Sequence, residues 1–347
     1  MLQPATPPPI TTTRARSLTR GTVRVWHDER NTGTKGDMGM PPVEEVVAAV
    51  PAWAGRHVEH ELLKGGLSHS IHVVRVDGER FVLRILNRAV EQALLGIPAE
   101  QEIENTVRAA RSGVGAQVHE VLPEYPALVL EFIDGETMSL DAVREQANIE
   151  RIAAACRALH ERTPPFVNRF DIFRQLEGFL ELCHRHELRI PDGYEERLPT
   201  VRRIEAALAA RPLPQAPCHN DLLAENFIDT AVGVRIVDWQ LSGMNDAAFE
   251  LGDIAAESDF EPERAEALAA AYFGAAAEPA LLARVRLYLL MSNFTWTLWF
   301  SVHHGLLEGS QADFDYWAEA ADKWAQAVRD LDDPGFGRTL DVVAGGR

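Results

Sequence analysis

The stretch that indicates the fold most strongly is residues 219–226, which read His-Asn-Asp-Leu-Leu-Ala-Glu-Asn, with Asp238 following at the end of an apolar strand. Phosphoryl transfer needs such a set. One carboxylate accepts the proton of the attacking group, while a carboxamide and a second carboxylate hold Mg²⁺ on the phosphates. We therefore predict Asp221 as the base and Asn226 and Asp238 as metal ligands. A plainer interpretation is that Asp221 and Asn226 satisfy backbone amides in a turn and that Asp238 caps a strand end.

The residues before this motif begin with a β-rich part. Apolar spacing predicts a short helix over 43–50 and a longer one over 99–112, which stops at Gly113. Alternating or β-branched runs predict strands, and Asp77-Gly78 is a strong hairpin turn signal. The five predicted strands cover residues 58–64, 70–76, 80–86, 117–121 and 127–133.

After Asp134-Gly135 the pattern is mainly helical. Helices are predicted over 139–160, 173–186, 191–210 and much of 261–328, with one β-hairpin inside residues 226–238. The predicted fold class is α+β with two lobes: a small N-terminal antiparallel β-sheet lobe with one long helix, and a larger, mainly α-helical C-terminal lobe. We place these lobes at 41–133 and 134–330, between a disordered tail at 1–40 and a C-terminal tail at 331–347.

Charge and cysteine content argue against several classes of protein. The 347 residues include 34 Lys and Arg against 52 Asp and Glu, a net charge of −18 that would repel a nucleic acid. Cys156, Cys183 and Cys218 are too few and too far apart for a disulfide framework or a paired-cysteine metal site, which indicates reduced, buried thiols in a cytoplasmic protein. The apolar stretch 287–302 is interrupted by polar residues and is too short for a bilayer core of about 30 Å. We expect it to be a buried helix and expect no membrane partner.

The first residues of the chain do not have the pattern of a secretory signal peptide, because they contain four arginines and no apolar core. A transit peptide or a true start at Met38 or Met40 are alternatives. The weak hydrophobic periodicity favours a disordered tail.

On these motifs the chain resembles the eukaryotic-type-kinase-like phosphotransferases, which include aminoglycoside phosphotransferases and choline and ethanolamine kinases. Residues 219–226 and 236–239 carry the resemblance, which extends from about Val43 to Ala327. Within this group the chain looks like the choline/ethanolamine kinase branch. The resemblance implies a protein-kinase-like fold, ATP and Mg²⁺ as cofactors, and transfer of the γ-phosphate to an alcohol.

The resemblance also implies a nucleotide site in the small lobe. Gly65, Gly66 and Ser68 match a glycine-containing loop in which backbone N–H groups approach phosphate oxygens without an intervening Cβ. A plain hairpin is the alternative, and His69 stands where the family often has Asn. Arg84 matches the phosphate-binding Lys of protein kinases, and its guanidinium can hold two phosphate oxygens. An exposed strand arginine is the alternative there.

Further residues of the small lobe follow from the same resemblance. Glu102 is expected to orient Arg84, with Glu100 and Glu104 as rivals on a helix face that solvation alone would also explain. Glu131 and Ile133 lie where adenine would pair with main-chain groups.

For the acceptor, the resemblance implies a site for a small cationic alcohol. Glu250, Asp253 and Glu257 share one helix face. The helix dipole explains acids in the first turn, but Glu257 lies two turns in and matches the acid that choline kinases place beside the substrate cation.

Three aromatic residues match the same family pattern, namely Trp296, Trp299 and Tyr316. Aromatic faces attract alkylammonium ions by roughly 0.5–2 kcal/mol per ring. By spacing alone, the tryptophan pair is more typical of a helix core.

Two departures from the family pattern affect the acceptor. Gln240 and Leu241 replace a Glu and a Tyr that often follow the metal-binding Asp, so either Phe260 and Trp299 rebuild the cation pocket or the acceptor is not choline. The preferred hypothesis is an ATP- and Mg²⁺-dependent kinase of choline, ethanolamine or a related amino alcohol. The alternatives are an aminoglycoside or other hydroxyl-compound phosphotransferase and a catalytically silent kinase-like module. The sequence leaves the oligomeric state open, a homodimer included.

Overall fold

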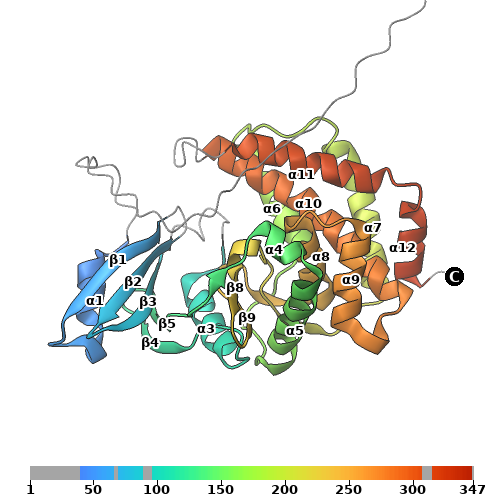
Figure 1. Cartoon of the computed structure of the whole chain (residues 1–347). Coiled ribbons are helices and arrows are strands. Elements are labelled where there is room, and N and C mark those ends of the chain that lie inside the picture. The colour runs from blue at the N-terminus through green and yellow to red at the C-terminus, as the bar shows by residue number, and fades with distance from the viewer. Residues whose placement is uncertain (1–39, 66–68, 89–95, 307–314, 346–347) are drawn as a thin grey trace, which may run out of the picture. The chain divides into compact units, whose positions relative to one another are not determined.

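The computed structural model describes residues 40–65, 69–88, 96–306 and 315–345, which belong to one compact unit, Met38–Arg347. Residues 1–39, and with them nearly all of the predicted disordered tail, lie outside this description. The architecture is α+β, with an N-terminal antiparallel sheet and a larger helical C-terminal part (Figure 1). The predicted fold class is therefore confirmed.

The N-terminal sheet has five strands in the order β1-β2-β3-β5-β4. They are β1 (Val58–Gly65), β2 (His69–Val76), β3 (Glu79–Leu86), β4 (Val118–Leu122) and β5 (Ala127–Glu131). Every predicted strand of this sheet is confirmed. Asp77 and Gly78 have positive φ values of 48° and 92°, as a two-residue hairpin turn requires, and Val76 pairs with Glu79 across it.

The two faces of this sheet pack against different elements. On one face, Leu83 and Ile85 of β3 are buried with apolar residues of α1 (Val43–Ala49) and of the 3₁₀ turn η1 (Pro51–Trp53). Side chains alternate along a strand, so Arg84 projects to the opposite face. There it meets α3 (Ala99–Ala110), which is confirmed as the long helix of this part.

The C-terminal part is built around α10 (Pro279–Leu306), which contacts most of the other helices of this part. Residues 289–298 of α10 are buried, polar ones included, which confirms the predicted buried helix. The other helices are α4 (Leu140–Arg144), α5 (Gln146–Arg162), α6 (Ile172–Arg185), α7 (Leu198–Ala210), α8 (Ala247–Glu257), α9 (Pro262–Phe273), α11 (Tyr316–Leu331) and α12 (Phe336–Ala344). Short 3₁₀ turns are η2 (Glu195–Arg197), η3 (Ala224–Asn226) and η4 (Gly274–Ala276).

Short strands frame the motif at 219–226. The predicted hairpin is β8 (Phe227–Thr230) and β9 (Gly233–Ile236), joined by β6 (Glu136–Thr137). A separate antiparallel pair consists of β7 (Gln215–Cys218) and β10 (Gly243–Asp246). The sequence analysis missed β6, β7 and β10, because runs of two to four residues carry little periodicity.

Two predicted helices differ from the structure. The prediction of a single helix over 139–160 was wrong, because the backbone of Glu145 is extended and separates α4 from α5. The helix over 191–210 was predicted too long, because α7 begins only at Leu198 and has proline in its first turn, a favoured starting position. Residues 331–347, set apart as a C-terminal tail, include α12, whose Leu340 and Val343 are buried in the main core.

Contacts that include the following join the N-terminal part to the segment around Asp238. Arg84 of β3 bonds Asp238, Ile97 N–H donates to the Gln240 carbonyl at 3.0 Å, and Gly115 forms a β-bridge with Ile236. Across the described ranges, no helix combines the length and apolar character needed to span a membrane.

Candidate active site

A buried carboxylate of α8 (Ala247–Glu257) accepts two backbone N–H groups of the loop at 219–226. Glu250 of α8 accepts the backbone N–H groups of His219 at 2.8 Å and Asn220 at 2.7 Å. Asn220 adopts a left-handed φ of 68°, which asparagine tolerates better than most residues. Glu250 lies in the first turn of α8, where the helix dipole favours an acid, and the N-cap is Asp246, which accepts the Ala248 N–H. The sequence analysis found the acidic face but missed this bracing role.

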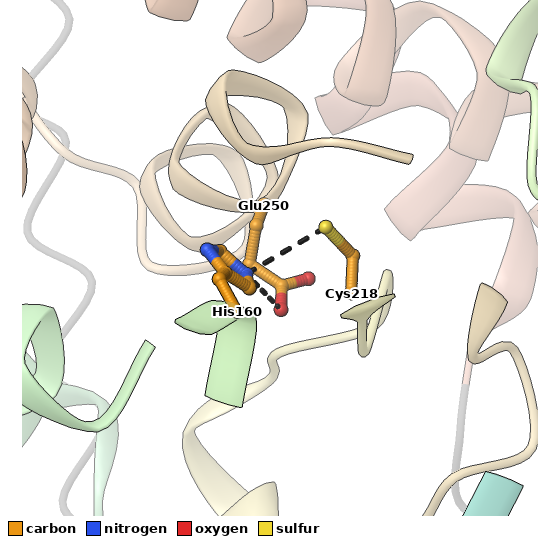
Figure 2. Close-up of side chains that lie close together, drawn as sticks. All are labelled: His160, Cys218 and Glu250. Atoms are coloured by element: carbon orange, nitrogen blue, oxygen red, sulfur yellow. Dashed lines mark hydrogen bonds and ion pairs between the residues drawn. The ribbon is translucent and has the colours of Figure 1, made fainter. Parts of the chain in front are cut away.

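Glu250 is itself part of a buried cluster with His160 and Cys218 (Figure 2). His160 Nε2 lies 3.3 Å from Glu250 Oε1 and 3.6 Å from Cys218 Sγ, and His160 Nδ1 lies 2.7 Å from the Tyr272 hydroxyl. Burial opposes ionisation of Glu250, but hydrogen bonds from His160 and the loop outweigh it and lower its pKa. The cluster therefore keeps a negative charge next to the backbone amides of His219 and Asn220.

His219 ties the loop to the strand that precedes Asp238. Its Nδ1 accepts the Asp221 N–H at 3.3 Å, so its Nε2 carries the proton and donates to the Val237 carbonyl at 2.9 Å. Val237 N–H donates to the Asn226 carbonyl at 3.0 Å. The loop and the hairpin thus bring together the backbone around Asp221, Asn226 and Asp238.

The side chains of Asn226 and Asp238 are suited to a hard cation. Asn226 Nδ2 donates to the Asp221 carbonyl at 2.7 Å, which fixes the amide and leaves its oxygen as a candidate ligand. Asp238 has a left-handed φ of 73° and a half-buried carboxylate. Carboxylate and amide oxygens are ligands of the kind that Mg²⁺ takes, so the residues present fit that ion.

Asp221 lies among other acids. Burial raises its pKa well above the usual range, and Asp253, Glu257, Asp238 and Glu225 raise it further. A carboxylate with a raised pKa is a stronger proton acceptor. The surrounding negative charge also favours a cation beside it.

Arg84 and Glu102 form the buried ion pair that was predicted. Arg84 Nε and Nη2 lie 2.9 and 2.8 Å from Glu102 Oε1, and Nη2 also bonds Asp238. The rivals Glu100 and Glu104 instead pair at the surface with Arg88 and Arg108. Burial opposes ionisation of Glu102, but Arg84 and then His69 lower its pKa overall.

His69 is a further member of this group that the sequence analysis singled out only as a departure. Its Nδ1 accepts the Asn87 N–H at 3.0 Å, so the proton is on Nε2, which lies 3.1 Å from Glu102 Oε2. The two oxygens of Glu102 thus face two different partners, Arg84 and His69.

Of the other residues expected to bind the nucleotide, the structure describes only some. Gly66 and Ser68 lie outside the described residues, and Gly65 ends β1 opposite Ser70. The backbone N–H of Glu131 is already donated to the Gln117 carbonyl at 2.8 Å, and its carboxylate bonds Arg235 at 2.9 Å. Ile133 is buried with apolar residues of the sheet.

On α8, Asp253 and Glu257 have separate partners. Asp253 accepts the Leu222 N–H at 3.2 Å, the Ser292 hydroxyl at 2.7 Å and the Trp296 indole N–H at 2.9 Å. Burial, and then the charge of Glu257, raise the pKa of Asp253 to about 7. Glu257 pairs with Lys323 of α11 at 3.0 Å. Like Glu250, Asp253 therefore braces the loop at 219–226, a role that its position on the helix did not reveal.

The expected aromatic residues fall into two environments. Trp296 is buried, with its ring tilted against Phe179. Trp299 and Tyr316 both lie against His303, with ring centroids 3.5 and 5.6 Å from the imidazole and 6.5 Å from each other. Burial lowers the pKa of His303 to about 4, so this imidazole is neutral at pH 7.

Two residues named in connection with the departures from the family pattern, Leu241 and Phe260, are buried. Leu241 is buried, and its carbonyl accepts Asn220 Nδ2 at 2.9 Å. Phe260 is buried in the main core, and the Arg264 guanidinium lies 5.8 Å from its ring centroid.

One other group has the composition of a metal site. His160, Cys218 and Glu250 place one nitrogen, one sulfur and one oxygen within 4.8 Å of one another. Hydrogen bonding explains this arrangement without an ion, because Glu250 already accepts two backbone amides and burial raises the pKa of the Cys218 thiol. We assign the cluster a structural role beneath the loop.

Comparisons with known proteins bear on the family and the fold of this chain. A family model described as "Phosphotransferase enzyme family" matches residues 59–288. A solved choline/ethanolamine kinase family protein from Mesorhizobium loti is 34% identical with a TM-score of 0.74, over 88% of this chain and 98% of that one. Protein LicA of Haemophilus influenzae is 25% identical over 255 residues, or 70% of this chain and 73% of LicA. Choline kinase LicA from Streptococcus pneumoniae is 20% identical, with a TM-score of 0.66 over 83% of this chain and 97% of that one, and shares the fold.

Proposed function

The chain belongs to the phosphotransferase enzyme family and, within it, to the choline/ethanolamine kinase family, and from that premise we propose that it transfers the γ-phosphate of ATP to the hydroxyl of choline, ethanolamine or a related amino alcohol. The observation that carries the choice of a cationic acceptor is the acidic surroundings of Asp221. Asp253 and Glu257 both act on its pKa, and both lie on the helix that braces its loop. A cation beside the attacking hydroxyl would be stabilised by these charges.

In this proposal the nucleotide lies between the sheet and the catalytic loop. Arg84 would hold phosphate oxygens, positioned by Glu102 and His69, and the backbone at Gly65, Gly66 and Ser68 would cover the phosphates. Glu131 and Ile133 would border the adenine. Because the N–H of Glu131 is engaged with Gln117, an adenine contact there falls to a carbonyl or to the backbone that follows.

Asn226 and Asp238 would hold Mg²⁺, which neutralises charge on the phosphates. Asp221 would accept the proton of the acceptor hydroxyl and keep that hydroxyl directed at the phosphate. Catalysis then comes mainly from positioning and from charge stabilisation. Glu257, Trp296, Trp299 and Tyr316 would form the cation side of the acceptor site.

The proposal is tested with two acceptors of the same shape. Choline and 3,3-dimethyl-1-butanol differ in a quaternary nitrogen against a carbon, so their ratio of kcat/KM isolates the effect of charge. We expect at least about tenfold preference for choline, or for ethanolamine over propanol, in an assay of ADP release, equivalent to about 1.4 kcal/mol. Asp221→Ala should lose turnover by about 10²–10⁴-fold while ATP still binds in calorimetry.

The alternatives give different results in the same assay. An aminoglycoside or sugar that is turned over when no small amino alcohol is would identify the other branch of the family. Binding of ATP without turnover of any acceptor would indicate a silent module. Equal rates with choline and its neutral analogue would contradict a cation-selective site.

A further inference from the structure

The acid expected to receive the acceptor cation already has a cation of the protein as its partner. Glu257 is about nine-tenths buried, and its Oε1 lies 3.0 Å from Lys323 Nζ. Lys323 is 6% exposed and donates a second hydrogen bond to the Ala256 carbonyl at 2.9 Å. A buried lysine held this way is an ammonium group fixed at the carboxylate that our proposed function gives to the substrate.

α11 presents this lysine on the same side as an expected substrate residue. Tyr316 and Lys323 are seven residues apart, which places them on one helix face. α11 also packs along α10, the helix that carries Trp296 and Trp299. One helix, α11, therefore brings the Tyr316 ring to Trp299 of α10 and the Lys323 ammonium group to Glu257 of α8.

The charges around Glu257 connect its ion pair with Lys323 to the choice between cationic and neutral acceptors. Asp253 and Glu257 both raise the pKa of Asp221, and Glu257 also raises the pKa of Asp253. Lys323 forms an ion pair with one of these three acids, Glu257. An acceptor ammonium that approaches Glu257 meets a carboxylate whose charge is already compensated. To pair with it, the acceptor must displace Lys323, which would keep only its bond to the Ala256 carbonyl.

We propose that Lys323 is a specificity-determining residue that competes with the acceptor cation for Glu257 and so weakens binding of cationic alcohols relative to neutral ones. This inference rests on the proposed function. A simpler role is that Lys323 caps the C-terminal end of α8, where a cation is favourable. That role affects stability alone and leaves acceptor discrimination unchanged.

The test compares KM for choline and for 3,3-dimethyl-1-butanol across three enzymes. Lys323→Met removes the charge at nearly constant length, so KM for choline should fall at least about fivefold while KM for the neutral alcohol stays constant. Lys323→Arg supplies a bidentate competitor and should raise KM for choline alone. Arg329→Met, an exposed change on the same helix, should leave both values as in the wild type.

Each outcome decides the matter. An unchanged choline KM in Lys323→Met, or an equal change for both alcohols, overturns the role of Lys323 while the proposed function stands. If Lys323→Met fails to fold, an unchanged choline KM in Lys323→Arg overturns it instead. If the wild type phosphorylates neither alcohol nor any other amino alcohol, the proposed function fails, and the role of Lys323 fails with it.

Discussion

At the scale of single residues, the buried ion pair of Arg84 and Glu102 is the clearest link between sequence and chemistry. Glu102→Gln removes a charge from a fully buried site and leaves Arg84 with Asp238 as its acidic partner. Because Arg84 keeps Asp238, we expect the free energy of unfolding to fall by about 1–3 kcal/mol, the cost of weakened charged hydrogen bonds, and KM for ATP to rise. Urea unfolding and ATP-dependent kinetics measure the two effects.

The same helix supplies the control for that change. Glu100 pairs with Arg88 at 2.8 Å on an exposed surface. Glu100→Gln should alter stability by less than about 1 kcal/mol and leave KM for ATP unchanged. Similar losses of stability and similar increases in KM for ATP in both variants would contradict a particular role of Glu102 in holding Arg84.

Asp253 gives a prediction for pH. Its pKa in the folded protein is about 7, above the ordinary value of 3.8, because of burial and the nearby Glu257. The folded state therefore holds a proton that the unfolded state releases, so this group contributes less stability as pH rises from about 4 to about 7. The free energy of unfolding of the wild type, relative to Asp253→Asn, should decline by up to about 1.4 kcal/mol per pH unit and level off above pH 8. A difference that stays constant between pH 5 and 8 would rule out this titration.

At the scale of elements, the packing of α8 on α10 sets the positions of the acids. Gly252 lies at this crossing, and a Cβ there would fall 2.6 Å from the Leu289 backbone nitrogen. Asp253, the next residue, bonds Ser292 and Trp296 of α10. The close approach of the two helices therefore holds Asp253 against α10 and next to the Leu222 N–H of the loop at 219–226.

Gly252→Ala should separate these helices. We expect unfolding free energy to drop by about 1–3 kcal/mol from overpacking, and kcat to decrease because Asp253 shifts under the loop. Gly337→Ala is the matched control, because a Cβ at Gly337 meets nothing within 4 Å and alanine favours a helix, so it should stabilise by up to about 1 kcal/mol. Thermal unfolding and acceptor kinetics on both variants check this. If Gly252→Ala leaves both the stability and kcat unchanged, the packing of α8 on α10 at Gly252 does not position Asp253.

At the scale of the whole molecule, local patterns predicted the fold and longer-range contacts decided the details. The strands of the N-terminal sheet and the pairing of Arg84 with Glu102 followed from alternation and from the family pattern. The break at Glu145 did not, because apolar spacing continues through it. The bracing by Glu250 and Asp253 was missed because their hydrogen bonds reach backbone amides some thirty residues away, which leave no periodic signal. Lys323 is separated from Glu257 by 66 residues, so pattern alone could not pair them.

The central claim is that Asp221, Asn226 and Asp238 act together on one nucleoside triphosphate. A crystal structure with a non-hydrolysable ATP analogue and Mn²⁺ tests it most directly, since the anomalous signal locates the ion independently of the protein fit. We predict a Mn²⁺ peak bonded to Asn226 Oδ1 and Asp238, with the γ-phosphate facing Asp221 and a phosphate oxygen on Arg84. A nucleotide bound elsewhere, or a metal that contacts neither Asn226 nor Asp238, would contradict the account.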